Sequence, residues 1–206
     1  MIFKDIKMRT IGEQLKKPKG IVGRFYISKL MKKSNQIVYD AMLEQLELNQ
    51  NDKIFEIGYG NGLGVNMIAT NFDCLIEGVD FSKLMYNEAR KRNKEHIENK
   101  KVKLYYGDFL KYNLPENCYD KIYCLNVVYF WDDLKIPFSK IRNGLKQGGI
   151  FCMYMNHRDL LNKMEFTKDD IFNKRTIEQV INNLEESCFK DISFKTQYGY
   201  YIKCRK

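Results

Sequence analysis

The sequence lacks the features that mark membrane-spanning and secreted proteins. No apolar run approaches the ~20 residues that a helix needs to cross a bilayer. Residues 1–7 have neither the apolar core nor the small-residue cleavage site of a signal peptide. The six cysteines include no Cys-x-x-Cys pair, and two histidines are too few to complete a metal site by spacing. We therefore expect a reduced, cytoplasmic protein with no membrane span and no metal.

Linker signals are also scarce. The chain has three prolines, no Gly/Ser-rich stretch and no internal repeat, which favours one main domain with a terminal addition. The best candidate boundary is the polar turn at residues 49–52. Before it, apolar residues at positions 37, 38, 41, 42, 46 and 48 predict an amphipathic helix over residues 37–48. Residues 1–49 are therefore predicted as an N-terminal helical arm or lid, and residues 50–206 as the main domain.

Acidic residues are few in the N-terminal arm. The whole chain has a net charge of +9, and residues 1–40 carry ten Lys or Arg against three Asp or Glu, which accounts for seven of those charges. A basic surface of this kind can hold an anionic partner such as RNA. The chain is, however, rich in Lys, Asn, Ile and Tyr throughout, a bias that needs no anionic partner. Nucleic-acid binding is possible but not favoured.

Strand-like and helix-like segments alternate after residue 52. Strands are predicted at residues 53–57, 74–79, 102–106, 121–125, 150–155, 191–196 and 200–204, and helices at residues 63–70, 82–97, 133–145 and 176–184, with Ser82 as a candidate N-cap. The last two strands are joined by too few residues for a parallel crossover, so they should form an antiparallel hairpin. The predicted fold class is α/β: a doubly wound, mostly parallel seven-stranded sheet with one antiparallel strand near the C-terminus, plus N-terminal helices.

The most informative segment follows the first predicted strand. An apolar run ends in the carboxylate of Glu56, and glycines then occupy positions 58, 60, 62 and 64. Such spacing lets the backbone approach a ligand more closely than a Cβ would allow. A dinucleotide fingerprint, Gly-x-Gly-x-x-Gly, would need its third glycine at position 63, which is leucine. The pattern Glu-x-Gly-x-Gly-x-Gly instead resembles the first motif of the class I S-adenosylmethionine-dependent methyltransferases, which have a Rossmann-like fold.

The resemblance implies an S-adenosylmethionine site at the carboxyl ends of the first strands, with S-adenosylhomocysteine as the product. It assigns Glu56 to the methionine end of the cofactor and Asp80, 24 residues later, to the ribose hydroxyls. Asp108, at the end of the third strand, would receive the adenine amino group, with Phe109 packing on the ring. The predicted cofactor site comprises Glu56, Gly58, Tyr59, Gly60, Gly62, Asp80, Phe81, Met85, Asp108, Phe109 and Asn126.

The end of the fourth strand should form the wall between cofactor and acceptor. Methylases of base amino groups resemble one another here through Asn/Asp-Pro-Pro-aromatic, a signature that Val127 and Val128 break after Asn126. C5-methylases need a cysteine in a proline-flanked turn, whereas Cys124 lies within the strand. An apolar pocket for a small acceptor and simple packing of a helix on the sheet are equally consistent with the next three residues, Tyr129, Phe130 and Trp131.

No residue is an evident catalyst. Transfer from a sulfonium is an in-line displacement, so the protein mainly aligns the reactants and excludes water. A base is needed only for an acceptor such as a hydroxyl. His157, after the fifth strand, and Tyr129 are the candidates, and a solvated loop position is the alternative for His157.

The basic arm could decide the substrate. The resemblance implies a lid, in which Arg24 and Tyr26 are candidate substrate contacts. A membrane-surface helix is the alternative, but basic and apolar residues do not segregate on its faces. The predicted function is methyl transfer to an O, N or S atom of a small-molecule acceptor. An RNA or protein methyltransferase that uses the basic arm, and a cofactor-binding protein without turnover, are the alternatives.

Overall fold

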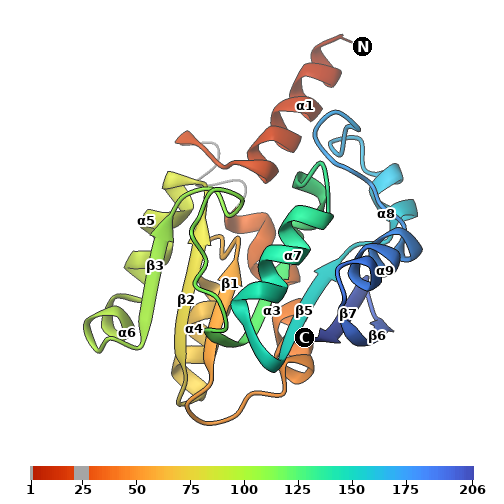
Figure 1. The fold of residues 1–206 in the computed structure, drawn as a ribbon. Coiled ribbons are helices and arrows are strands. Elements are labelled where there is room, and N and C mark those ends of the chain that lie inside the picture. The colour runs from red at the N-terminus through yellow and green to blue at the C-terminus, as the bar shows by residue number, and fades with distance from the viewer. Residues whose placement is uncertain (1, 21–27) are drawn as a thin grey trace.

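The computed structural model describes residues 2–20 and 28–206, whose strands form one mixed sheet with helices on both faces (Figure 1). The strand order is β3-β2-β1-β4-β5-β7-β6. Neighbours are parallel from β3 to β5, and β7 is antiparallel to β5 and β6. The strands are β1 (Lys53–Ile57), β2 (Leu75–Asp80), β3 (Val102–Tyr106), β4 (Tyr119–Leu125), β5 (Leu145–Met155), β6 (Lys190–Thr196) and β7 (Tyr200–Arg205). The predicted doubly wound sheet with a reversed strand near the C-terminus is confirmed.

Two hydrophobic clusters separate the helices into two layers. Helices α3, α4 and α5 contribute to the cluster on one face, and α7 and α9 to the cluster on the other. The described helices are α1 (Ile2–Lys16), α3 (Ser28–Leu46), α4 (Leu63–Asn71), α5 (Lys83–Arg92), α6 (Lys94–Glu98), the 3-10 turn η2 (Val128–Phe130), α7 (Lys135–Gly144), α8 (Arg158–Lys163) and α9 (Ile177–Glu186). Each layer thus covers a sheet that is apolar on both sides.

The central strands explain why the sequence shows continuous apolar runs. Along β1, Phe55 and Ile57 join the cluster of α7 and α9, while Ile54 joins the cluster of α3 and α4. In β4, Ile122 and Tyr123 divide in the same way. Because successive side chains point to opposite faces, a strand buried on both faces forms a nearly continuous apolar run.

The predicted helix over residues 82–97 is wrong, because the chain forms two helices there. Ser82 caps α5 as predicted: its Oγ accepts a hydrogen bond from the Met85 amide at 3.3 Å. The fully buried Asn93 then ends the helix. Its Nδ2 donates to the carbonyl of Ala89 at 2.9 Å and to the carbonyl of Gly62 at 3.1 Å. Helical periodicity could not reveal that this side chain ties the helix end to the glycine turn.

Two other elements begin well before their predicted first residues. The amphipathic helix predicted at residues 37–48 is the C-terminal part of α3, in which Met42 and Leu46 are fully buried against the sheet. Strand β5 begins at Leu145 rather than at residue 150, with a register shift in its pairing to β4. Gly148, at a φ of 74°, lies in this irregular start of the strand. Because α3 packs against the sheet, the predicted N-terminal arm includes a helix of the core.

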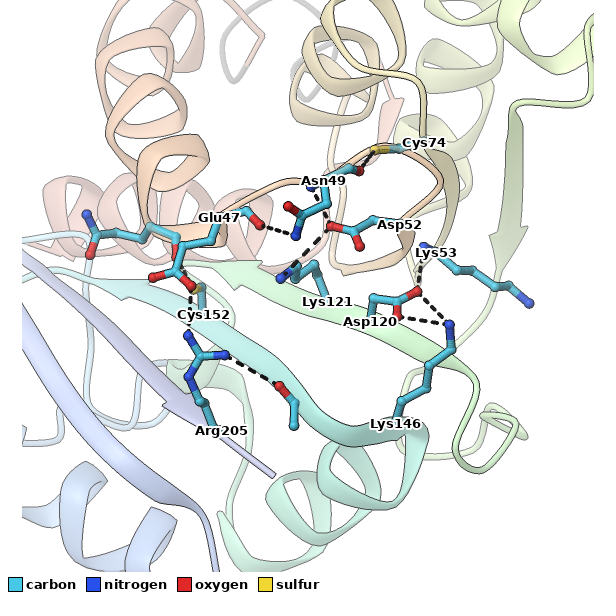
Figure 2. Close-up of polar contacts among 12 residues, drawn as sticks. Glu47, Asn49, Asp52, Lys53, Cys74, Asp120, Lys121, Lys146, Cys152 and Arg205 are labelled. Atoms are coloured by element: carbon cyan, nitrogen blue, oxygen red, sulfur yellow. Dashed lines mark hydrogen bonds and ion pairs between the residues drawn. The ribbon is translucent and has the colours of Figure 1, made fainter.

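The amino ends of the central strands carry a set of paired charges (Figure 2). The pairs are Asp52 with Lys121, Asp120 with Lys146, and Glu47 with Lys203 and Arg205. Asp52 and Lys121 are both about nine-tenths buried, at 3.9 Å, whereas Asp120 and Lys146 are partly exposed, at 2.7 Å. These contacts connect β1, β4, β5 and β7 at the edge opposite to the glycine turn.

Candidate cofactor and acceptor site

The glycine turn after β1 contains three residues in the left-handed region, where glycine is strongly favoured. Gly58, Gly60 and Gly62 have φ values of 70°, 53° and 74°. A Cβ at Gly58 would lie 2.7 Å from the loop after β4, one at Gly62 would lie 2.6 Å from the Asn93 side chain that follows α5, and one at Gly64 would lie 2.2 Å from α3. Of the four glycines at positions 58, 60, 62 and 64, Gly60 alone has space for a Cβ, with nothing within 4 Å. Packing therefore accounts for three of the glycines, and Gly60 is the one that faces open space.

Asp80 connects the glycine turn to α5. It ends β2, and its side chain accepts the amide N–H of Gly60 on Oδ2 at 2.9 Å and that of Ser82 on Oδ1 at 2.8 Å. Burial raises the pKa of this carboxyl to about 6, against the lowering effect of those two amides and of the Lys17 charge. A carboxylate retains lone pairs beyond these bonds, so Asp80 can still accept from a ligand.

Four other residues predicted for the cofactor site, Asp108, Phe109, Phe81 and Met85, lie in different environments. Asp108 is exposed at the end of β3, with its Oδ1 accepting the amide of Leu110 at 2.9 Å. Phe109 is instead buried, with its ring 6.0 Å from that of Trp131. Phe81 is half-buried and Met85 is buried in α5. Asp108 and Phe81 are therefore accessible to a ligand, whereas the side chains of Phe109 and Met85 are packed in the core.

Glu56 is fully buried at the end of β1. Its Oε1 accepts the Tyr39 hydroxyl of α3 at 2.9 Å, and its Oε2 accepts the Tyr123 hydroxyl of β4 at 2.7 Å. Burial raises the pKa of Glu56 to about 7, although both tyrosines and the amide of Val65 hydrogen-bond the carboxylate. Sequence reasoning did not single out these tyrosines, because neither lies in a recognisable motif.

A polar cluster joins the ends of β4 and β5. Asn126, at a φ of 57°, accepts on Oδ1 from the Tyr129 hydroxyl and from Nδ2 of Asn156, both at 3.1 Å. The backbone N–H of Asn156 donates to the Tyr129 hydroxyl, and the Tyr154 hydroxyl donates to Oδ1 of Asn156 at 3.2 Å. Asn156 was missed from the sequence, although it follows β5 as Asn126 follows β4.

The aromatic segment after Asn126 is mostly core. Tyr129 and Trp131 are 1% and 4% exposed, and both belong to the cluster of α7 and α9. Phe130 is half-buried, with its ring 5.1 Å from that of Phe172 and the Lys16 ammonium 5.8 Å from its centroid. Of the three aromatic residues predicted for the acceptor pocket, only Phe130 keeps open surface.

Comparisons with known sequences agree with this arrangement. A family model described as "Methyltransferase domain" matches residues 55–153. The uncharacterized methyltransferase YdaC of Bacillus subtilis is 28% identical over 167 residues, which is 81% of this chain and 87% of that protein. The sterol 24-C-methyltransferase ERG6 of Saccharomyces cerevisiae is 24% identical over 132 residues, or 64% of this chain but only 33% of that protein.

Solved structures share the fold. A putative S-adenosylmethionine-dependent methyltransferase of Methanococcus maripaludis has a TM-score of 0.71 at 22% identity, covering 89% of this chain and 92% of its own. Phosphoethanolamine N-methyltransferase 2 of Haemonchus contortus, in complex with S-adenosylmethionine, has a TM-score of 0.66 at 22% identity, covering 79% of this chain and 38% of its own. The chain belongs to the class I S-adenosylmethionine-dependent methyltransferases. Its cofactor supplies a methyl group already activated as a sulfonium.

The N-terminal arm of the methyltransferase crosses the carboxyl edge of the sheet, above which α1 stands in Figure 1. The Ser82 hydroxyl donates to the carbonyl of Pro18 at 2.7 Å, and the Lys17 ammonium lies 5.3 Å from the centroid of Phe81. With Lys16 over Phe130, the segment contacts both sides of the site. The predicted substrate contacts Arg24 and Tyr26 lie outside the described residues.

His157 lies apart from the polar cluster of the methyltransferase. It precedes α8, and its ring meets that of Tyr200 edge-on at 4.2 Å. Both residues line a cavity of about 320 Å³, together with residues of α8 and the start of α9. The structure thus brings Asn126 and Tyr129 together and places His157 in a neighbouring cavity beyond Asn156.

The described residues fit the cofactor. The Gly60 backbone faces open space beside the Asp80 carboxylate, and Asp108 is exposed farther along the same edge. Within residues 2–20 and 28–206, no group of three potential ligands gathers to hold a metal ion, and no helix is long and apolar enough to cross a membrane.

Proposed function

We propose that this methyltransferase moves the methyl group of S-adenosylmethionine to an O, N or S atom of a small molecule by in-line displacement. The observation that carries the proposal is the crossing of the site by Lys16–Pro18, which contacts Phe81 and Ser82 on one side and Phe130 on the other. A segment in this position acts as a lid that admits a small acceptor more readily than a polymer. Two printed names point to small-molecule acceptors: the sterol 24-C-methyltransferase matched in sequence, whose name specifies a carbon atom, and the phosphoethanolamine N-methyltransferase that shares the fold.

In this proposal the open part of the glycine turn holds the cofactor. The backbone from Gly58 to Gly62 lies along its methionine end, and Asp80 accepts the ribose hydroxyls. Asp108 accepts the adenine amino group, with Phe81 beside the ring. Asn126 contributes its amide nitrogen, because its Oδ1 already accepts two hydrogen bonds and its Nδ2 has no partner among the described residues.

Orientation is the main contribution that the protein makes to the reaction. Holding the two reactants in line can supply roughly 7–11 kcal/mol of the barrier. Tyr129 is poorly suited as a base, because burial raises its pKa and its hydroxyl is already engaged by Asn126 and Asn156. For a hydroxyl acceptor that needs a base, His157 is the candidate, provided that the acceptor enters the cavity that it lines.

Calorimetric titration with S-adenosylmethionine and S-adenosylhomocysteine tests the cofactor site. Asp80→Ala should lose binding of both ligands. The matched control is Asp73→Ala, because Asp73 precedes the same strand at its amino end, is largely exposed and pairs with Lys101. Equal loss in both variants, or no binding by the folded wild type, would contradict the assignment.

A second candidate acceptor is RNA, which the concentration of seven of nine net positive charges in residues 1–40 favours. Methyl transfer from labelled cofactor to total RNA and to a protein-free small-molecule extract separates the two. Transfer to RNA should fall steeply between 50 and 200 mM salt, by about 10³-fold if six phosphates are contacted, whereas transfer to a neutral acceptor should barely change.

A further inference from the structure

Glu56 is a buried carboxylate without a cationic partner. The Tyr39 and Tyr123 hydroxyls and the Val65 amide, in the first turn of α4, all donate to it. Among the described residues, no Lys, Arg or His forms an ion pair with this group. Neutral donors therefore hold a charge that could not otherwise be accommodated in the interior.

The surroundings of Glu56 add negative charge rather than positive charge. The titratable groups facing it are Tyr39 from α3, Tyr123 and Cys124 from β4, Asp80 from β2 and Tyr59 from the glycine turn. Burial keeps the tyrosines and Cys124 neutral by raising their pKa values. Lys17 and Arg92 act only at longer range, on Asp80 and Tyr39 respectively. Two carboxylates, Glu56 and Asp80, thus face the glycine turn without a contacting cation.

Another carboxylate in the same sheet shows the usual solution. Glu77, on β2, also accepts a tyrosine hydroxyl, that of Tyr119 at 3.0 Å, but it contacts the Lys53 ammonium at 3.3 Å as well. At Glu77 a tyrosine donor thus accompanies a cation instead of replacing it. Among the described residues, the buried carboxylates without a contacting cation, Glu56 and Asp80, both lie at the edge where a ligand is expected.

We propose that Glu56, clamped by Tyr39 and Tyr123, makes the site prefer the sulfonium of S-adenosylmethionine over the neutral thioether of S-adenosylhomocysteine. The two molecules share their amino-acid and nucleoside parts and differ by the methyl group and its positive charge. In its ionised form, Glu56 in the low-dielectric interior favours the cation over the neutral thioether without touching either. This inference rests on the cofactor lying along the glycine turn, as proposed above.

The same arrangement couples cofactor binding to a proton. With a pKa of about 7, Glu56 is partly protonated in the free protein at neutral pH. A cation beside the turn favours the ionised carboxylate, so binding of S-adenosylmethionine releases a proton and tightens as the pH rises from 6 to 8. Methyl transfer removes the sulfonium charge. Glu56 then takes up a proton and the product is held less tightly.

Calorimetry at pH 7.0 in phosphate and in Tris measures the protons exchanged, because the two buffers have different ionisation enthalpies. S-adenosylmethionine should release more protons than S-adenosylhomocysteine from the wild type. Glu56→Gln should remove that difference and reduce the ratio of the two affinities by about tenfold, equivalent to one pKa unit of coupling. Glu77→Gln is the matched control and should change neither quantity.

Two further variants keep the test decisive if Glu56→Gln does not fold. Tyr39→Phe and Tyr123→Phe each remove a donor to the carboxylate, so the midpoint of the pH dependence of the affinity ratio should move to higher pH. An unshifted midpoint, or wild-type proton release in folded Glu56→Gln, overturns the inference. Failure of the folded wild type to bind either ligand instead overturns the placement of the cofactor.

Discussion

The two edges of the sheet hold their carboxylates in different ways. At the amino edge, Asp52 and Asp120 each contact a lysine (Figure 2). At the carboxyl edge, Glu56 and Asp80 are held by hydroxyls and backbone amides, with no ion pair among the described residues. The pKa values follow: burial acts to raise that of Asp120, but Lys146 and the Lys53 amide lower it overall, whereas burial dominates for Glu56.

Under the proposed placement of the cofactor, this difference separates carboxylates that stabilise the fold from carboxylates that act on a bound ligand. A protein that satisfies its buried acids with lysines at one edge has the means to do so at the other. Leaving Glu56 and Asp80 without a contacting cation lowers stability, and binding of a positively charged cofactor can recover that loss. Variants at the amino edge should therefore affect stability alone, while those at the carboxyl edge should also affect binding.

The largest stability effect is expected at the most buried ion pair. Lys121→Met leaves Asp52 without its cation in a site where both side chains are about nine-tenths buried, so the free energy of unfolding should fall by about 3 kcal/mol. Urea denaturation measures this. Adding Asp52→Asn to Lys121→Met should restore part of the loss. Cofactor affinity per folded molecule should stay within twofold of wild type, and a larger drop would erase the contrast between the edges.

Most carboxylates make a protein less stable as the pH falls, but Glu56 at the carboxyl edge should make it less stable as the pH rises. The pKa of Glu56 in the fold, about 7, lies above its ordinary value of 4.5. Below pH 4.5 Glu56 is protonated in the folded and unfolded states, so its ionisation costs no stability there, and this cost grows until the pH passes about 7. The wild type without cofactor should lose about 3 kcal/mol more than Glu56→Gln between pH 4.5 and 8. Parallel stability curves for the two proteins would show that Glu56 titrates normally.

Much of the fold follows from sequence patterns that depend on local physics. Apolar runs buried on both faces predicted the parallel strands, and the short connection near Tyr198 predicted the reversed one. The break at Asn93 was not predictable, because it depends on a hydrogen bond to Gly62 that forms only after folding. Likewise, β5 starts early because its pairing with β4 tolerates an irregularity.

The candidate site also contains residues that the sequence pattern identifies and residues that only the folded structure reveals. Glu56, Asp80 and the glycines are marked by their spacing. Tyr39 and Tyr123 carry no such mark, since a tyrosine on a helix and one on a strand are ordinary core residues. From the sequence, the aromatic residues after Asn126 were equally consistent with an acceptor pocket and with packing of a helix on the sheet. Their burial in the structure shows that Tyr129 and Trp131 pack in the core.

A pair of glycines sharpens the comparison between edges. Gly60 and Gly148 both have positive φ and open space at the Cβ position, one at each edge. Alanine at either should cost about 1–2 kcal/mol of stability through left-handed strain. Gly60→Ala should also weaken cofactor binding by about tenfold, because the added methyl occupies space that the proposal gives to the ligand. Calorimetry that finds equal affinities for the two variants would move the cofactor away from Gly60.

The smallest effect is expected at the exposed ion pair of the amino edge. Asp120 and Lys146 are partly exposed, so their mutual attraction is screened by solvent and salt. Lys146→Met should therefore change the free energy of unfolding by less than about 1 kcal/mol, and the change should shrink further at high salt. Because Asp120 also accepts the Lys53 amide at 2.9 Å, it keeps a partner when the lysine is removed. Thermal unfolding at low and high salt tests this, and a loss as large as that of Lys121→Met would mean that exposure does not set the strength of these pairs.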